Sequence, residues 1–317
     1  MEKFLSCDWG TSTFRLRLIN ADNLRVLAET THESGIADTH RQWLLQPEGS
    51  LSRRACYTAV LKQRLDELSQ RAGIALDDIP IVLSGMASSS MGMVELPYKS
   101  LPFDLDGSDL IVEALPNLDV SNPIFMVSGA RTDHDVMRGE ETKVLGCSAI
   151  VTENSDKQLL ILPGTHPKHI IVIRRQAVEL ATYMTGEFFD LLSTHSVLST
   201  SVEAGANFGD AEAQRWFSEG VEASRTSGML KAAFKVRTNE LLRQIPKTHN
   251  FYYLSGILIG SELQHITPAV PVYLIAGSMH RALYKKALQI IDVPIAGELD
   301  ADLALIKGQR MILSRLS

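Results

Sequence analysis

Residues 4–19 read FLSCDWGTSTFRLRLI, and this stretch decides the fold. An apolar run leads to Asp8, small and hydroxylated residues follow it, and apolar and basic residues then alternate from Phe14 to Leu18. Strict alternation of this kind is typical of a β-strand with one buried face. The stretch therefore predicts two strands joined by a tight turn, with an acidic side chain at the end of the first strand.

The turn has the composition of a phosphate-binding loop. Gly10 lets the backbone approach an oxyanion closely, Thr11 and Ser12 add hydroxyl donors, and Asp8 can hold a divalent cation directly or through water. The motifs G-x-G-x-x-G and G-x-x-x-x-G-K-[ST] are not present, which excludes the two familiar phosphate loops. Taken alone, the tetrapeptide DWGT is equally compatible with a plain hairpin turn.

Composition narrows the class of protein. The chain has 317 residues, 45% of them hydrophobic and 21% charged, which is typical of a globular protein with about two domains. Its net charge of -6 argues against a nucleic-acid-binding protein. Cys7, Cys56 and Cys147 form no C-x-x-C motif, and no apolar run is long enough to span a membrane. We therefore expect a cytoplasmic protein, with Cys7 and Cys147 as thiols of the core.

Hydrophobic periodicity predicts an α/β chain. The predicted strands that follow the first hairpin are residues 24–28, 81–83, 123–127, 159–162, 170–173, 179–182 and 272–278. The predicted helices are residues 52–71, 141–150, 185–192, 209–242, 252–263 and 279–291, and residues 33–37 are expected to form a loop. Gly256 and Gly260 lie four residues apart in one of these helices, a spacing that permits close helix packing.

The second half repeats the opening pattern. Residues 159–173 read LLILPGTHPKHIIVI, an apolar strand, a turn that contains Gly164 and Thr165, and a second apolar strand. Two such hairpins about half the chain apart indicate an internal duplication. If a pseudo-twofold axis relates the halves, the two turns grip one polyphosphate from both sides. We place the domain boundary near residue 150, which gives domains 1–150 and 151–317.

Three other segments have polar or small residues next to a predicted strand, where ligand clefts of α/β proteins form. The small-residue loop 84–92 has hydroxyls that suit a polyol, although it also reads as a plain connection. Segment 128–141 is dense in ionisable groups. A metal site made of Asp133, His134 and Asp135 is an alternative there, but three adjacent residues rarely converge on one ion. Gly277 suits a flat adenine, or an ordinary turn from strand to helix.

Together, DWGT at 8–11, LPGTHPK at 162–168 and IAG at 275–277 resemble the two phosphate motifs and the adenosine motif of the actin/hexokinase superfamily. More narrowly, VMRGEET at 136–142, MTGE at 184–187 and LSGILIG at 254–260 resemble the 2-dehydro-3-deoxygalactonate kinase family. The second phosphate loop departs from that family at Pro167, which lacks an N–H donor. The resemblance implies a two-domain α/β fold of the actin/hexokinase-like (ribonuclease H-like) type, with duplicated mixed sheets and an interdomain cleft.

The resemblance also implies an activity. The family phosphorylates 2-dehydro-3-deoxy-D-galactonate to its 6-phosphate in galactonate catabolism, with ATP and Mg²⁺. The expected partner is this sugar acid, without nucleic acid or membrane, and a homodimer is a further expectation. Alternatives are a kinase of another sugar acid, an ATPase of the same fold, and a sugar-binding protein that lacks catalysis.

Site roles follow from the resemblance. The phosphates of ATP are expected at Gly10, Thr11, Ser12, Gly164, Thr165 and Lys168, adenine at Gly277, and Mg²⁺ near Asp8. Glu140 is the first choice for the base that takes the acceptor proton, and Asp135 and then Asp133 are the alternatives. By residue type alone, Glu140 and Glu141 also fit the first turn of a helix, where acids are stabilising.

The substrate carboxylate calls for a planar, bidentate partner, which Arg138 or Arg15 can supply. We expect the sugar-acid hydroxyls to contact residues from two loops, namely Ser34, Gly35, Gly85, Met86 and Ser89. Closure of the two domains on the substrate should expel water, which otherwise competes as the acceptor.

Overall fold

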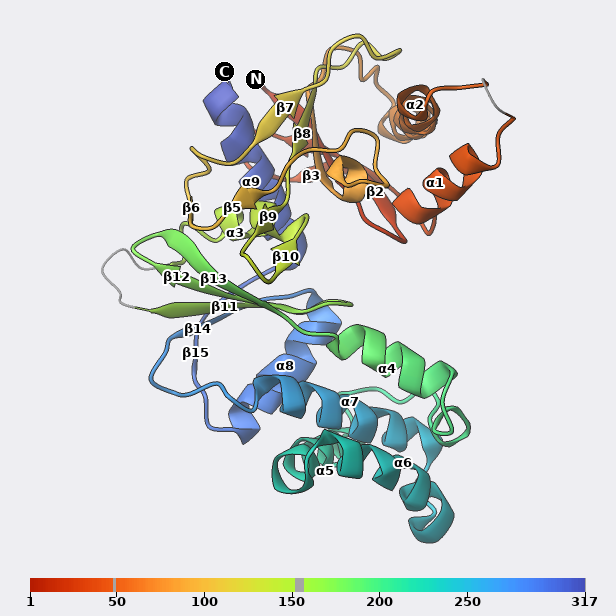
Figure 1. Ribbon diagram of the computed structural model, residues 1–317, viewed down its shortest axis with the longest axis vertical. Coiled ribbons are helices and arrows are strands. Elements are labelled where there is room, and N and C mark those ends of the chain that lie inside the picture. The colour runs from red at the N-terminus through yellow and green to blue at the C-terminus, as the bar shows by residue number, and fades with distance from the viewer. Residues whose placement is uncertain (48–49, 152–156, 317) are drawn as a thin grey trace. The chain divides into compact units, whose positions relative to one another are not determined.

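The computed structural model describes residues 1–47, 50–151 and 157–316 (Figure 1). The chain divides into two compact units. Unit 1 comprises Met1–Asn154, Arg174–Leu180 and Asp302–Ser317, and unit 2 comprises Ser155–Ile173 and Ala181–Ala301. A division into functional domains at residue 150 stays a prediction.

Unit 1 is built on a six-stranded mixed sheet with the order β3-β2-β1-β4-β8-β7. Its strands are β1 (Lys3–Trp9), β2 (Phe14–Asn20), β3 (Val26–His32), β4 (Ile81–Gly85), β7 (Val112–Ala114) and β8 (Ile124–Val127). A small sheet consists of β5 (Lys99–Ser100), β9 (Ala130–Arg131) and β10 (Val136–Met137). The helices of this unit are α1 (Ile36–Leu44), α2 (Arg53–Ala72), α3 (Glu140–Gly146) and α9 (Ala301–Leu316), with one 3₁₀ turn (Met86–Ser88).

The first hairpin has the predicted register. β1 and β2 pair antiparallel from Lys3 opposite Asn20 to Trp9 opposite Phe14. The Trp9 and Phe14 rings meet edge to face with centroids 5.0 Å apart, and Tyr57 of α2 lies 5.6 Å from Trp9. Such aromatic pairs stabilise beyond the area that they bury. The core of unit 1 therefore starts directly beneath the DWGT turn.

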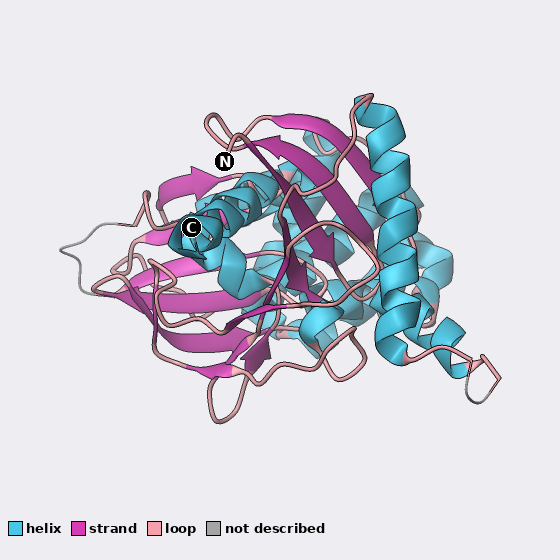
Figure 2. Cartoon of the chain, turned by 90° about the horizontal axis from the view of Figure 1, so that it is seen from above, coloured by secondary structure: helices cyan, strands magenta, loops and turns pink. Residues whose placement is uncertain are grey.

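Strand alternation gives the first sheet two covered faces. Leu5, Cys7 and Leu83 point into the cluster that includes Leu61 and Leu65 of α2, and Figure 2 shows α2 as the long helix beside the strands. On the other face, Nε2 of Gln309 in α9 donates to Ser84 Oγ at 3.1 Å, to Cys7 O at 3.1 Å and to Val82 O at 3.2 Å. The last helix of the chain thus holds the two central strands β1 and β4 together.

Unit 2 contains a mixed sheet with the order β15-β14-β11-β12. Its strands are β11 (Gln158–Leu162), β12 (Lys168–Ile173), β14 (Val272–Ile275) and β15 (Ile295–Leu299). Its helices are α4 (Thr185–Thr194), α5 (Ala211–Ser227), α6 (Met229–Arg243), α7 (Lys247–Leu263) and α8 (Ser278–Ile290), with one 3₁₀ turn (Ser199–Ser201). The strand β13 (Gln176–Thr182) falls mostly in unit 1, where Gln176 and Ala177 pair with β6 (Phe103–Asp104).

The two units repeat one arrangement of strands. β1 pairs antiparallel with β2 and parallel with β4, and β4 pairs parallel with β8. In the same way, β11 pairs antiparallel with β12 and parallel with β14, and β14 pairs parallel with β15. The predicted duplication into two mixed sheets is confirmed.

Close packing of α5 against α7 confirms the prediction made from the glycine spacing. A Cβ atom at Gly256 would lie 2.1 Å from Phe217 O, and one at Gly260 would lie 2.6 Å from Ser224 Oγ. Gly220 of α5 meets Tyr253 O of α7 in the same way. α5, α6 and α7 accordingly lie against one another in Figure 1.

Several element predictions differ from the structure. The helix expected over residues 209–242 is two helices, α5 and α6, because the chain turns at Gly228, which has a φ of 74°. β3 starts at Val26 instead of residue 24, because the Asn20 side chain accepts from two amides of the preceding turn and Leu24 has a φ of 58°. The expected loop 33–37 is wrong for its last two residues, which begin α1. The helix expected to reach residue 150 ends at Gly146, where its backbone meets Ala304 of α9. Helix α9 itself has no counterpart among the predicted elements.

The cysteines agree with their predicted core positions. Cys7 and Cys147 are fully buried, and all three cysteines are free thiols. Burial raises the pKa of the Cys7 thiol well above its usual range, and the neighbouring Asp8 charge adds to this. No described helix combines the length and apolar character needed to cross a membrane.

Candidate functional site

The first predicted phosphate loop is a closed turn at the carboxyl end of β1. The amide of Gly10 donates to Thr13 O at 2.9 Å, and Thr11 and Ser12 are exposed. Asp8 is half-buried just before the turn. Among the residues that the structure describes, none donates a hydrogen bond to the Asp8 carboxylate. Its oxygens are therefore free to accept from water or a cation.

The start of α1 fixes the back of this loop. The amides of Ile36 and Ala37 donate to Gly10 O at 2.9 Å and Thr11 O at 3.0 Å. A Cβ atom at Gly35 would lie 2.5 Å from either of these two carbonyl oxygens, so only glycine fits there. Ser34 is half-buried beside it. Gly35 thus supports the first loop, and contact of Ser34 and Gly35 with a sugar stays a prediction.

The second loop is supported in the same way. The amide of Glu187 donates to Thr165 O at 3.1 Å, and a Cβ atom at Gly186 would lie 2.6 Å from Gly164 O. Gly186 is the second residue of α4, as Gly35 directly precedes α1. The duplication therefore extends from the strands to the glycine that braces each turn. Sequence reasoning gave Gly186 no role, although a glycine at the start of the next helix in both halves is a usable signal.

The polar residues of the second loop have local partners. Nζ of Lys168 donates to His166 O at 3.1 Å, and the side chain is largely buried. His166 Nε2 lies 2.5 Å from Glu187 Oε2. Pro167 has no N–H, but its carbonyl accepts from the amide of Tyr183 at 2.9 Å. A phosphate contact of Lys168 stays a prediction.

A cavity of about 560 Å³ lies within unit 2 beside this loop. Its lining includes Gly164, Thr165 and Gly186, Ser255 of α7, and Met279 and His280 at the start of α8. A Cβ atom at Gly164 or Gly277 would meet no atom within 4 Å, and neither residue has a positive φ. Neither packing in the described chain nor backbone strain explains these two glycines, whereas close approach of a ligand does.

A larger cavity of about 1260 Å³ also lies within unit 2, and it does not contain the predicted site residues. It is lined by Lys285, Lys286 and Gln289 of α8, whereas His280 and Tyr284 of α8 line the smaller cavity. Tyr252 and Met279 line both cavities, so the two cavities adjoin. Lys285 in the larger cavity pairs with Glu298 at 2.6 Å.

In unit 1, two glycines bring three predicted segments together. Gly85 has a φ of 94°, and a Cβ atom there would lie 2.8 Å from Trp9 O and 3.3 Å from Asp8 Oδ1. Gly139 has a φ of 108°, and its Cβ would lie 3.2 Å from Gly85 Cα. Both residues need the conformational freedom and the small size of glycine. The carboxyl ends of β1 and β4 therefore meet the N-terminus of α3, which begins with Glu140.

The two carboxylates at the start of α3 have different environments. Glu140 is half-buried, and its Oε2 accepts from the amide of Arg138 at 3.1 Å. Glu141 is fully buried, and its oxygens accept from the amide of Gly139 at 2.7 Å and from Thr142 Oγ1 at 3.1 Å. Burial, and then the charge of Glu140, raise the pKa of Glu141 to about 8. Glu140 is the carboxylate that a ligand can reach.

Arg138 links this segment to the 85–90 loop. Its Nη1 donates to Ser88 O at 2.5 Å and Ser88 Oγ at 2.6 Å, and its guanidinium lies 4.1 Å from the Tyr98 ring centroid. Within that loop, Ser89 Oγ donates to Met86 O at 2.7 Å. Arg138 therefore orders the loop that sequence analysis assigned to the sugar acid.

Arg15, the other candidate for the substrate carboxylate, forms an ion pair inside unit 1. Its Nη1 lies 2.8 Å from Asp302 Oδ1, and Nη2 of Arg17 lies 2.6 Å from Asp302 Oδ2. Arg17 also pairs with Glu29. The guanidinium of Arg15 thus anchors α9, and a substrate role for it stays a prediction.

The two alternative base residues lie on the hairpin formed by β9 and β10. Asp133 is exposed, and Thr132 Oγ1 accepts from the amides of His134 and Asp135. Asp135 Oδ1 accepts from the amide of Val136 at 2.7 Å. Across the described ranges, no group of three or more His, Cys, Asp or Glu side chains is arranged to hold a metal ion.

Comparison with known proteins identifies relatives that cover most of the chain. The model of the family described as 2-keto-3-deoxy-galactonokinase matches residues 8–312. The 2-dehydro-3-deoxygalactonokinase of Escherichia coli (strain K12) is 30% identical over an alignment of 290 residues, and the match covers 86% of this chain and 93% of the relative. A protein of Rhizobium meliloti (strain 1021) assigned the same activity is 31% identical over 264 residues, 82% of this chain and 79% of its own.

A solved structure has a similar fold over nearly the whole chain. The crystal structure of a Sinorhizobium meliloti protein, also assigned as a 2-dehydro-3-deoxygalactonokinase, superposes with a TM-score of 0.80 at 29% sequence identity. The match covers 99% of this chain and 96% of that one.

Proposed function

Because this chain belongs to the 2-keto-3-deoxy-galactonokinase family, we propose that it transfers the γ-phosphoryl group of ATP to 2-dehydro-3-deoxy-D-galactonate and forms the 6-phosphate. The family model spans both glycine-centred turns and the segment that carries Glu140. One structural observation carries the proposal. In unit 2, the Gly164 turn opens into a cavity of about 560 Å³ without any packing reason for its glycine.

Unit 2 has the features of a nucleotide site. Backbone amides of a turn attract phosphate oxygens, and a glycine allows the backbone to approach them. Gly164 and Thr165 would meet the phosphates, while Gly277, Met279 and His280 at the start of α8 would border the base. The volume of the cavity falls within the range of small-molecule sites.

Unit 1 has the features of a site for Mg²⁺ and the sugar acid. Mg²⁺ keeps several waters and is usually bound through one or two carboxylates and the substrate phosphates, so a single free carboxylate such as Asp8 fits it. The ion, when bound, neutralises charge on the phosphates. Gly10, Thr11 and Ser12 would contact the outer phosphates, since their turn is exposed next to Asp8.

Phosphoryl transfer needs alignment, charge stabilisation and a base for the acceptor hydroxyl. Glu140 fits the base best, because it is half-buried, lies at the N-terminus of α3 and follows the contact between Gly139 and Gly85. The proton of the O6 hydroxyl would pass to Glu140 as that oxygen attacks the γ-phosphorus. Arg138 orders the 85–90 loop and would face the carboxylate of the sugar acid.

The test of this function is ADP release from the purified full chain with a panel of sugar acids. Turnover only with a 2-keto-3-deoxy sugar acid supports the kinase, and the best substrate identifies the stereochemistry. Turnover with ATP alone would favour the ATPase of the same fold. Thermal stabilisation by the sugar acid without turnover would favour the non-catalytic binder.

The assignment of the base predicts that Glu140→Gln lowers kcat by about 10² to 10⁴-fold, because it removes the group that accepts the proton. Its melting temperature should stay close to that of the wild-type protein. Asp133→Asn tests the third candidate, which lies at an exposed hairpin, and its kcat should be unchanged if Glu140 is the base. Wild-type turnover in Glu140→Gln, with a deficit in Asp135→Asn or Asp133→Asn, would transfer the role to the residue that shows the deficit.

We also propose a cytoplasmic homodimer. The free, buried state of all three cysteines supports a reducing compartment. The homodimer rests on the expectation from sequence, and light scattering of the purified protein would decide it.

A further inference from the structure

Glu262 is a buried carboxylate next to the smaller cavity of unit 2. It lies one residue before the end of α7, and only 1% of its side chain is exposed. An ionised carboxylate is costly to remove from water unless hydrogen bonds and an opposite charge compensate it. The residues that compensate Glu262 therefore indicate what this carboxylate does in the fold.

Three side chains donate to Glu262. His169 Nε2 lies 2.9 Å from Oε1, while Thr185 Oγ1 and Tyr284 OH lie 2.5 Å and 2.7 Å from Oε2. Burial, and then the charge of Glu262, raise the pKa of Tyr284 well above its usual range, so this phenol keeps the proton that it donates. Both carboxylate oxygens are satisfied, and the three donors come from three different elements.

Two of the donors line the cavity, and the third lies in the strand that follows a turn lining it. Thr185 and Tyr284 line it directly, Thr185 as the first residue of α4 and Tyr284 one turn beyond His280 in α8. His169 follows the Gly164 turn in β12, and its ring packs on Tyr183 with centroids 4.5 Å apart. The amide of Tyr183 in turn donates to Pro167 O in that turn.

We propose that Glu262 is a positioning residue for nucleotide binding, which sets the phosphate turn, the start of α4 and helix α8 in their places around the cavity. This inference rests on the proposed nucleotide site in unit 2. Glu262 does not touch the reacting atoms. It acts through Thr185, His169 and Tyr284, and its loss should affect the nucleotide and leave the sugar acid unaffected.

The test compares Glu262→Gln and Tyr284→Phe with the wild-type full chain. The first variant keeps the shape of the side chain and removes its charge, and the second removes one donor. A hydrogen bond to a buried charge is worth about tenfold or more in an equilibrium constant, so the Kd for ADP and the KM for ATP should rise by about tenfold. The KM for the sugar acid should change by less than about twofold.

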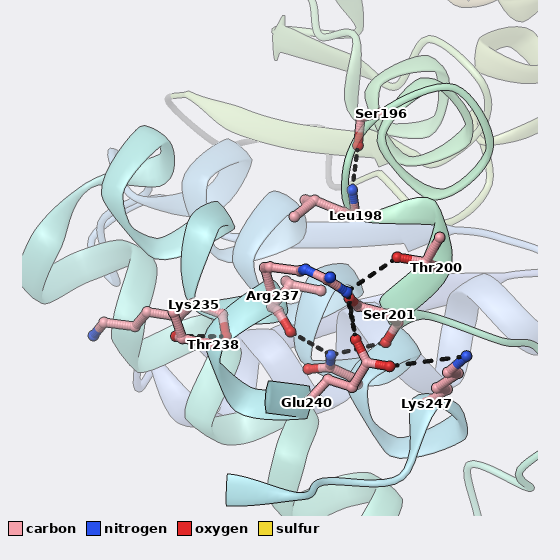
Figure 3. Close-up of polar contacts among 11 residues, drawn as sticks. Ser196, Leu198, Thr200, Ser201, Lys235, Arg237, Thr238, Glu240 and Lys247 are labelled. Carbon is pink, nitrogen blue, oxygen red and sulfur yellow. Dashed lines mark hydrogen bonds and ion pairs between the residues drawn. The ribbon is translucent and has the colours of Figure 1, made fainter. Parts of the chain in front are cut away.

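The chain offers a matched control in Glu240 (Figure 3). Glu240 of α6 also accepts from several donors of unit 2, namely Ser201 Oγ at 2.6 Å and Arg237 Nη1 at 2.8 Å, with Lys247 Nζ at 3.8 Å. None of these four residues lines the smaller cavity. Glu240→Gln should therefore leave the Kd for ADP unchanged even if it lowers the melting temperature.

The outcomes separate this inference from the proposed function. If Glu262→Gln and Tyr284→Phe lower the melting temperature but bind ADP as the wild-type protein does, Glu262 is only structural and the inference fails. Should Glu262→Gln not fold, Tyr284→Phe decides by itself. If the wild-type protein binds ADP but phosphorylates none of the sugar acids, the proposed function fails while a raised Kd in the variants still supports the inference. Wild-type protein that binds no ADP overturns both.

Discussion

At the scale of single residues, the adjacent carboxylates Glu140 and Glu141 differ in burial, and this difference suits them to different roles. Glu140 is half-buried and accepts one hydrogen bond, at Oε2, whereas Glu141 is fully buried with both oxygens hydrogen-bonded. Pairs of acids whose environments differ in this way commonly divide ionised and protonated roles between them. The sequence shows two identical neighbours, and only their surroundings distinguish the candidate base from a core acid.

The pKa of Glu141 predicts how stability depends on pH. This pKa is raised from 4.5 to about 8 in the folded chain, so between these values the folded state holds a proton that the unfolded state has released. The free energy of unfolding therefore falls as pH rises, by up to roughly 1.4 kcal/mol per pH unit from this group. Glu141→Gln cannot ionise, so its urea-unfolding free energy should decline less between pH 5 and 8 than that of the wild-type protein.

Glu240→Gln is the control of opposite sign. Hydrogen bonding from Ser201 is the first cause that lowers the pKa of Glu240, and the charges of Arg237 and Lys247 contribute further. A carboxylate whose pKa is lowered in the folded state stabilises the fold at pH values above its unfolded pKa of about 4.5. This stabilisation is lost as the pH falls through the folded pKa. This variant should therefore differ from the wild-type protein in slope only at acidic pH. A wild-type slope in Glu141→Gln between pH 5 and 8 would contradict the assignment.

At the scale of elements, each of the two glycine-centred turns is braced by the start of the following helix. Gly35 before α1 and Gly186 in α4 lie directly against the carbonyls of the two turns, and the next amides donate to these carbonyls. The hairpin alone does not set the direction of its turn. The helix start holds these carbonyls in place through hydrogen bonds.

Two glycine substitutions in unit 2 distinguish support from ligand contact. In Gly164→Ala the new Cβ meets no atom, so the melting temperature should hold while the affinity for ADP falls by about tenfold, since the methyl group occupies the space of a phosphate. In Gly186→Ala the Cβ would lie 2.6 Å from Gly164 O, so stability and affinity should both fall. Alanine is otherwise the better helix former by about 1 kcal/mol, so propensity cannot explain that loss.

Calorimetry and thermal unfolding measure both quantities for the two variants. Wild-type ADP affinity in Gly164→Ala would mean that this turn does not meet the nucleotide. A Gly186→Ala protein more stable than wild type would mean that α4 and the turn move apart without loss.

At the scale of the whole molecule, the two units contain different parts of the proposed chemistry. The nucleotide cavity belongs to unit 2, and the carboxylates Asp8 and Glu140 with the 85–90 loop belong to unit 1. The cleft between the two halves stays a prediction from sequence. Protection from hydrogen exchange by each ligand can assign that ligand to one of the two units.

Hydrogen exchange should therefore respond differently to each ligand, because a bound ligand lowers the population of locally open states. ADP should slow exchange mainly in residues 160–170, 183–188 and 277–284 of unit 2. The sugar acid alone should slow exchange mainly in residues 84–92 and 136–142 of unit 1. Protection by ADP that is confined to unit 1, or by the sugar acid that is confined to unit 2, would contradict this division.

The sequence by itself determined the two hairpins, the glycine-centred turns and the family. Residues of a strand alternate between its two faces, so a hairpin with one buried face leaves an alternation of apolar and polar residues that can be seen in the sequence. Most helices and strands were likewise predicted within a few residues. Asp8, Gly10, Gly164 and Glu140 could be chosen from the sequence as candidates, because residue type and position after a strand indicate what chemistry they can do.

Only the tertiary structure decided which of these residues meet and what supports them. Helix α1 begins without a side-chain cap, because its first amides bond to carbonyls of the distant Gly10 turn. Helix α9 reaches back to β1 and β4 through Gln309. Glu262 gathers donors from three separate elements. Contacts between residues far apart in the chain leave no periodic pattern in the sequence. Such contacts determine how each turn is supported and what surrounds each carboxylate.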